Sequence, residues 1–137
     1  MNILFFILLK DKIDFVYDTF SLRQTLEKMD NSGYTSLPIL NDKGEYVATI
    51  TEGDILRYIK NTDKFTLRNA EKVPLSNVNI KRNVKSIKIY SNIEDLIELV
   101  LEQNFVPVVD DMNHFIGIIT RKAVISHLVD LVKKGEQ

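Results

Sequence analysis

The chain contains no cysteine, and this absence removes several kinds of chemistry. Its 137 residues can form no disulfide and offer no thiol nucleophile, and a structural zinc site would lack its usual ligands. A cysteine-free chain fits a reducing compartment, so we expect a cytoplasmic protein.

Excess charge of one sign is also missing. The 18 Lys and Arg residues nearly balance the 19 Asp and Glu residues, and the formal net charge is -1. So small a charge provides no long-range attraction for nucleic acid or anionic lipid. One modest basic run exists, made of Lys81, Arg82, Lys85 and Lys88. Acidic residues follow it closely, so we interpret it as a solvated edge and expect neither nucleic acid nor a membrane as a partner.

No hydrophobic run is long enough to cross a bilayer, which takes about 20 residues. The longest candidate, Ile3 to Leu9, has seven apolar residues. A secretory signal would also need positive charge before this run and small residues after it, and neither is present. We therefore interpret the run as a segment buried against the domain.

Patterns typical of catalysis are absent as well. The sequence has no nucleophile elbow, no glycine-rich phosphate loop and no paired carboxylates. Its two histidines, His114 and His127, fall in a predicted hairpin and a predicted helix and do not form a metal-ligand set. We predict a protein that is not an enzyme and requires no cofactor or metal.

What the sequence does contain is a duplication. Residues 34–59 return 69 residues later, without a gap, as residues 103–128. Pro38 then corresponds to Pro107, and Thr51 to Thr120. Apolar spacing and turn residues predict the same order in each copy: strand, helix, strand, hairpin strand, helix. The expected segments are 15–17, a helix from Ser21, 37–40, 46–50 and a helix from 52, then 86–89, a helix after Asn92, two strands, and a helix that Gly135 ends.

This order predicts an α+β fold in which each copy is a three-stranded sheet with two helices. Because both helices would cover one sheet face, the other face, with Ile39, Val47, Val108 and Ile116, needs cover. We expect the copies to pack sheet to sheet about a pseudo-twofold axis, which creates two clefts between them. The expected boundaries are one module over 1–137, with repeat 1 at 10–60, a connector at 61–80 and repeat 2 at 81–132.

The doubled pattern resembles the CBS domain pair, or Bateman module, from about Ile3 to Leu128. Gly-Tyr-Thr-x-hydrophobic-Pro at residue 33 and Ile-Thr-Glu-Gly-Asp at residue 50 are most similar to stand-alone bacterial CBS pairs. Some of those proteins bind AMP, ATP or cyclic di-AMP. The resemblance implies a regulatory sensor that binds an adenine nucleotide in the clefts, forms a homodimer and signals to a partner protein. The alternative is a ligand-free module for protein interaction and dimerisation.

The family's nucleotide motif matches Thr51 and Asp54, with Ala48 at the position of a small residue. The resemblance implies that Asp54 accepts the ribose hydroxyls and that Thr51 lies beside ribose and phosphate. A helix N-terminus also suits a phosphate on physical grounds. The competing interpretation is a capping box, in which Thr51 and Asp54 serve the helix alone. The same pair can also serve both roles.

The resemblance implies further nucleotide-binding positions in both copies. Thr35 and Asn104 would line the adenine and ribose pockets, while Asn83 and Ile13 or Asp14 would close over the base. Neighbouring positions expected to contribute are Tyr34, Ser36, Thr49, Phe105 and Val106.

The second copy departs from the motif, because Ala123 stands where the first copy has Asp54. Thr120 remains, and it is followed by Arg121 and Lys122, two cations in a first helical turn where the helix dipole disfavours them. One interpretation is that these cations, joined by Lys12, bind the phosphates of a nucleotide. The other is that they are solvated surface charges. Either way, the two copies should not bind alike.

Overall fold

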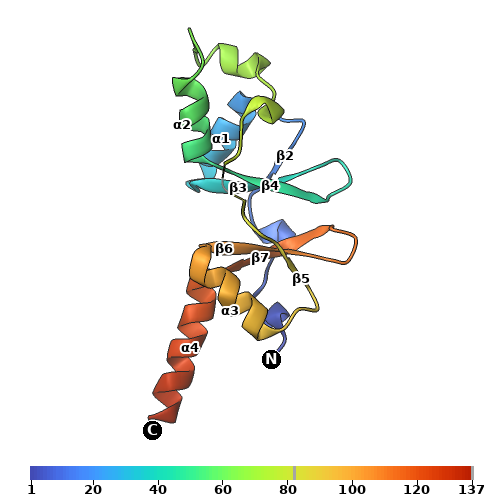
Figure 1. Ribbon diagram of the computed structural model, residues 1–137, viewed down its shortest axis with the longest axis vertical. Coiled ribbons are helices and arrows are strands. Elements are labelled where there is room, and N and C mark those ends of the chain that lie inside the picture. The colour runs from blue at the N-terminus through green and yellow to red at the C-terminus, as the bar shows by residue number, and fades with distance from the viewer. Residues whose placement is uncertain (82, 137) are drawn as a thin grey trace. The chain divides into compact units, whose positions relative to one another are not determined.

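The computed structural model describes residues 1–81 and 83–136 and forms two compact units (Figure 1). Residues 14–83 form the first-repeat unit, and residues 1–13 with 84–137 form the second-repeat unit. The basic residue Arg82, from the predicted solvated edge, lies outside the described residues.

The first-repeat unit has a three-stranded sheet in the order β2-β3-β4. β2 runs parallel to β3, and β4 returns antiparallel through a hairpin. A capping box of Ser21 and Gln24 begins α1, and Gly33, at a φ of 75°, ends it in the left-handed conformation that glycine adopts without strain. The elements are β2 (Val16–Tyr17), α1 (Leu22–Ser32), β3 (Ser36–Leu40), β4 (Tyr46–Thr51), α2 (Glu52–Lys60), η3 (Asn69–Lys72) and η4 (Leu75–Asn77).

The predicted connector at 61–80 belongs to this unit. Val73 O accepts the amide of Leu22 at 2.8 Å, and Phe20 O accepts that of Leu75 at 3.0 Å. Ala70 and Leu75 are buried in the same core as Leu22. The segment is therefore a fixed part of the first-repeat unit.

The second-repeat unit has a four-stranded sheet in the order β1-β7-β6-β5. Its core contains Leu96, Val106 and Ile119, each fully buried. The elements are η1 (Ile3–Phe6), β1 (Leu8–Leu9), η2 (Lys10–Lys12), β5 (Ile87–Lys88), α3 (Ile93–Glu102), β6 (Phe105–Val109), β7 (Phe115–Thr120) and α4 (Arg121–Gly135).

The N-terminal segment supplies the fourth strand, which the sequence did not predict. β1 pairs antiparallel with β7, with Leu8 opposite Ile118 and Leu9 opposite Gly117. Ile3 and Phe6 are buried in the second-repeat core, as expected, whereas four residues of the same run are exposed: Leu4, Phe5, Leu8 and Leu9. The residues from Lys10 to Ile13 lie in the second-repeat unit.

The prediction that Val47 needs cover is wrong, since this side chain is 50% exposed. The pairing of β3 with β4 shifts between Ile39 and Leu40, so that Ile39 pairs with Ala48 and Leu40 with Tyr46. Val47 is the extra residue of this bulge and leaves the alternation of the strand. Ile39 itself is buried, as expected.

Candidate functional site

The candidate site begins where β4 turns into α2. Thr51 is the N-cap of α2, with the extended backbone angles φ -117° and ψ 160°. Its Oγ1 accepts the amide of Asp54 at 3.2 Å. Thr35 O accepts the amide of Glu52 at 2.9 Å and so fixes the entry to the helix. Two N–H groups of the first turn of α2, those of Glu52 and Asp54, therefore have acceptors outside the helical hydrogen-bond pattern.

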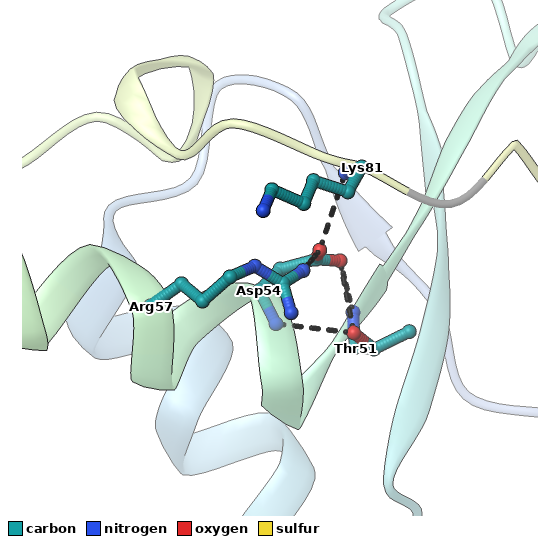
Figure 2. Close-up of polar contacts among 4 residues, drawn as sticks. All are labelled: Thr51, Asp54, Arg57 and Lys81. Carbon is teal, nitrogen blue, oxygen red and sulfur yellow. Dashed lines mark hydrogen bonds and ion pairs between the residues drawn. The ribbon is translucent and has the colours of Figure 1, made fainter.

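Asp54 completes a capping box from inside the unit. Its Oδ2 accepts the Thr51 amide at 3.0 Å and the Thr51 hydroxyl at 2.9 Å (Figure 2). The residue is only 1% exposed. The capping box of Thr51 and Asp54 is thus present.

The other carboxylate oxygen of Asp54 accepts hydrogen bonds from the Arg57 side chain and from the Lys81 backbone. Asp54 Oδ1 accepts from Arg57 Nη2 and, at 3.4 Å, from the backbone amide of Lys81. A buried carboxylate is costly unless charged or polar donors surround it, and Arg57 supplies the opposite charge. Sequence reasoning missed both residues. The position of Arg57, one helical turn beyond Asp54, was the available indication, whereas nothing in the sequence places Lys81, 27 residues away, beside Asp54.

These residues border a pocket of about 290 Å³ that lies wholly within the first-repeat unit. Asp54 is its one acidic lining residue among those described. The lining residues are Asp54, Arg57, Tyr58, Asn61, Thr62, Asn77, Asn79 and Lys81. Apart from Asp54, none of these was predicted as a binding residue.

The other predicted positions of the first-repeat unit differ in accessibility. Tyr34 and Thr35 are exposed at the entry to β3, and Ser36 is half-buried. Thr49 is 1% exposed, and its hydroxyl shares a 2.7 Å hydrogen bond with the Tyr46 hydroxyl. Burial raises the pKa of Tyr46, against the opposing effect of the bond to Thr49. The Thr49 side chain thus serves the interior, and a ligand contact by it would require this pair to open.

In the second-repeat unit, the helix start is only half capped. Thr120 Oγ1 accepts the amide of Ala123 at 3.1 Å. Ala123 has no acceptor with which to complete a capping box. Asn104 O accepts the amide of Arg121 at 2.8 Å, the counterpart of the bond from Glu52 to Thr35. The backbone of the junction is therefore kept while the carboxylate is absent.

Arg121 has a structural partner that sequence reasoning did not foresee. Its Nε donates to Val100 O at 2.6 Å, and its Nη2 lies 3.5 Å from Leu101 O. These carbonyls lie in the last turn of α3, where the helix dipole favours a cation. The guanidinium thus reaches away from the start of its own helix to the favourable end of another. Phosphate binding by Arg121 stays a prediction that would require it to leave these carbonyls.

Lys12 and Lys122, both exposed, are not brought together. Because β1 runs antiparallel to β7, the chain after Leu9 continues toward the start of β7, whereas Lys122 follows its end. The expectation that Lys12 joins Arg121 and Lys122 is therefore not supported by the order of the strands.

The remaining predicted positions are distributed over both units. Asn83 and Asn104 are exposed, whereas Phe105 and Ile13 are half-buried. Asp14 forms an ion pair with Lys28 at 3.3 Å. The side chain of Val106 is fully buried in the second-repeat core, so contact between it and a ligand is not compatible with this structure.

Residues 1–81 and 83–136 provide neither a metal-ligand cluster nor a membrane-spanning helix. These residues contain no group of three or more His, Cys, Asp or Glu side chains that could hold a metal ion. Within the same ranges, no helix combines the length and the apolar character needed to cross a membrane.

Comparison with known families decides what kind of duplication this is. The profile of the CBS domain matches twice, over residues 8–61 and 75–130. The chain belongs to the CBS domain family. The expected resemblance and the α+β fold of tandem CBS repeats are thereby confirmed.

One curated relative is the protein MJ1225 of Methanocaldococcus jannaschii. It is 31% identical over 136 residues, which cover 91% of this chain and 49% of the relative. This chain thus spans about half the length of the curated relative it matches. The crystal structure of MJ1225, described as a candidate archaeal homologue of g-AMPK, superposes with a TM-score of 0.77 at 27% identity, over 95% of this chain and 50% of that one.

Two other similar structures contain a bound ligand. A CbpB protein in complex with c-di-AMP has a TM-score of 0.87 at 21% identity, covering 99% of this chain and 89% of that one. CbpB of Listeria monocytogenes, also in complex with c-di-AMP, has a TM-score of 0.80 at 24% identity, covering 93% and 94%. At these identities, the likeness establishes the shared fold.

Proposed function

We propose that the protein is a regulatory module that binds an adenine nucleotide and transmits the binding event to a partner protein. The candidate ligands are AMP, ATP and cyclic di-AMP. The observation that carries the proposal is the buried Asp54 carboxylate, held at the start of α2 beside a polar pocket. Proteins of the same fold in complex with cyclic di-AMP support the ligand class.

Ribose binding at Asp54 has a definite structural requirement. Both carboxylate oxygens already accept bonds, from Thr51 on one side and from Arg57 and Lys81 on the other. Ribose hydroxyls would have to replace the longest of these bonds, the 3.4 Å contact from the Lys81 amide, and to turn the Thr51 hydroxyl away. Binding would then change the local contacts of the segment at Lys81, which gives a ligand a means to favour one conformation over another.

A thermal-shift panel of AMP, ADP, ATP, cyclic di-AMP and S-adenosylmethionine tests the proposal. A ligand present at about 100 times its Kd should raise the free energy of unfolding by about 2.7 kcal/mol. Asp54→Ala should abolish most of that shift, measured against the melting temperature of the unliganded variant. Asp42→Ala, at the exposed hairpin turn of the same unit, is the matched control and should keep the shift. No stabilisation by any of the five compounds would refute the adenine-nucleotide proposal.

One observation favours a second function, a ligand-free interaction module. The helix α4 carries an apolar stripe of residues that are between 41% and 61% exposed: Ile125, Leu128, Val129 and Val132. These residues recur at helical spacing and therefore share one face. If the stripe mediates a homodimer, Val129→Glu should convert a dimer to a monomer in size-exclusion chromatography with light scattering. A protein that is monomeric before the substitution would refute this function.

A further inference from the structure

The pocket beside Asp54 offers polar groups without partners in the described chain. The side chains of Asn61, Asn77 and Asn79 line it; all three residues are exposed, and no hydrogen bond joins their side-chain amides to another described residue. Carboxamide N–H groups are good donors to an acceptor-rich ligand. Three of them around one small pocket form a set of donors that the fold itself does not use.

Charge in the pocket is unbalanced toward the positive. Arg57 is ion-paired with the Asp54 carboxylate, so the unpaired positive charge of the pocket comes from Lys81. The Lys81 ammonium forms no ion pair with a described residue. Figure 2 shows Arg57 and the Lys81 side chain on the side of Asp54 away from Thr51. The exposed Lys81 ammonium beside this ion pair gives the pocket a net positive charge, which attracts an anion.

We propose that this pocket binds a phosphoryl oxyanion, with Arg57 and Lys81 as charged donors and the three asparagine amides as neutral donors. Charge-assisted bonds to phosphate are stronger than neutral ones, so a doubly charged phosphate group gains most from this donor set. A metal cation is excluded by the two positive side chains, although the amide oxygens alone could bind one. The pocket volume of about 290 Å³ is at the small end for ligand sites, which suits a phosphate better than a whole dinucleotide.

Two sources could supply the oxyanion: inorganic phosphate, or the phosphate of a nucleotide whose ribose occupies Asp54. The second source rests on the proposed function, and the first does not. The arrangement predicts that AMP binds more tightly than adenosine and that the difference depends on the cations of the pocket.

Isothermal titration calorimetry of the full chain with inorganic phosphate, AMP and adenosine tests this site. Lys81→Gln should weaken the binding of phosphate or AMP about fivefold and leave adenosine unchanged. Asn79→Asp, which is isosteric and adds a repelling charge, should weaken phosphate binding further. Lys43→Gln, an exposed residue of the hairpin turn with the same change in charge, should have no effect. Arg57 is left intact in these variants because it holds a buried carboxylate.

A measurement on the unaltered protein complements the variants. In two-dimensional NMR, the side-chain amide signals of Asn61, Asn77 and Asn79 should move on addition of phosphate, and those of Asn31, on α1, should not. Two results would overturn the site. In the first, Lys81→Gln binds phosphate and AMP as tightly as Lys43→Gln does. In the second, the amide signals do not move on addition of either phosphate or AMP.

The outcomes separate this site from the proposed function. Phosphate binding that depends on Lys81, with no binding of any adenine compound, supports the oxyanion site and refutes the nucleotide proposal. Adenosine and AMP binding with equal affinity, both lost in Asp54→Ala, together with no binding of inorganic phosphate, supports the nucleotide proposal and refutes the oxyanion site.

Discussion

The two repeats begin their last helices with the same threonine and then diverge. Thr51 and Asp54 cap each other around α2, whereas Thr120 caps α4 alone because Ala123 has no acceptor. Each repeat also uses its strand differently: β4 is an edge strand, while β7 has the extra partner β1. The two repeats therefore share one backbone arrangement. They differ in that the first has a buried carboxylate, while the sheet of the second has an additional strand, β1.

The largest expected difference between the repeats is in the free energy of unfolding lost on substitution of Gly117 and of its counterpart Ala48. A Cβ at Gly117 would lie 2.1 Å from Leu8 O, a backbone atom of β1 that cannot move alone. Gly117→Ala should lower the free energy of unfolding by about 3 kcal/mol, measured by urea denaturation, because β1 must shift. Ala48→Gly, in a strand with no such partner, should cost about 1 kcal/mol or less. An unchanged urea midpoint for Gly117→Ala would mean that β1 does not pair with β7 in solution.

Next in size is the effect of removing the capping carboxylate. Asp54→Ala leaves the Thr51 amide without its partner and Arg57 without its ion pair. We expect a loss of about 2 kcal/mol in the free energy of unfolding, without ligand. The equivalent position in the second repeat is already alanine, so that repeat shows that the helix can form without the carboxylate. A loss below about 0.5 kcal/mol would show that solvent replaces these bonds fully.

The reverse exchange should produce a smaller gain. Ala123→Asp would place a carboxylate where the first repeat has one, and complete a capping box with Thr120. The new charge also lies in the first turn of α4, which carries two cations and no acid. We expect about 0.5 kcal/mol of added stability in thermal unfolding at neutral pH, disappearing in acid. Destabilisation would indicate that the Ala123 site is too crowded for a carboxylate.

The smallest expected difference lies in the two hairpin turns. Asn41 Oδ1 accepts the amides of Lys43 and Glu45, and Asp110 Oδ1 accepts those of Met112 and His114 in the same way. Desolvation acts to raise the pKa of Asp110, but the bonds from His114 and Met112 outweigh it and hold the pKa below 3.8. A depressed pKa in the folded state adds stability above the unfolded value, and this stability is lost as pH falls through the folded value.

Asp110→Asn should therefore flatten the acid limb of a stability–pH curve below about pH 3.8 and keep the turn, since Asn41 shows that an amide fits. Asn41→Asp would place a carboxylate against Glu45 Oε1, which now accepts the Asn41 amide at 3.0 Å, so this variant should lose stability at neutral pH and regain part of it in acid. The measurement is the urea midpoint as a function of pH. Identical acid limbs for the parent and both variants would mean that the two turn residues do not contribute to acid unfolding.

Much of the fold could be predicted because it depends on local patterns. Apolar spacing and turn residues act over a few residues, and the helix from Ser21 and the hairpin between 37–40 and 46–50 appear as predicted. The bulge that exposes Val47 was not predictable, since it depends on how β3 and β4 settle against each other. The same holds for β1, whose two residues have no pattern that distinguishes them from the rest of an apolar run.

For the site, the sequence by itself determined that Thr51 and Asp54 lie together in the first turn of a helix, because residues three apart are neighbours on a helix. It also determined that the second repeat lacks the carboxylate. Only the tertiary structure decided that Asp54 is buried, that Lys81 comes to it from 27 positions along the chain, and that Arg121 bonds to the end of α3. These facts depend on which distant segments share one interior. A buried charge draws its donors from whatever lies near it in space, regardless of distance along the chain.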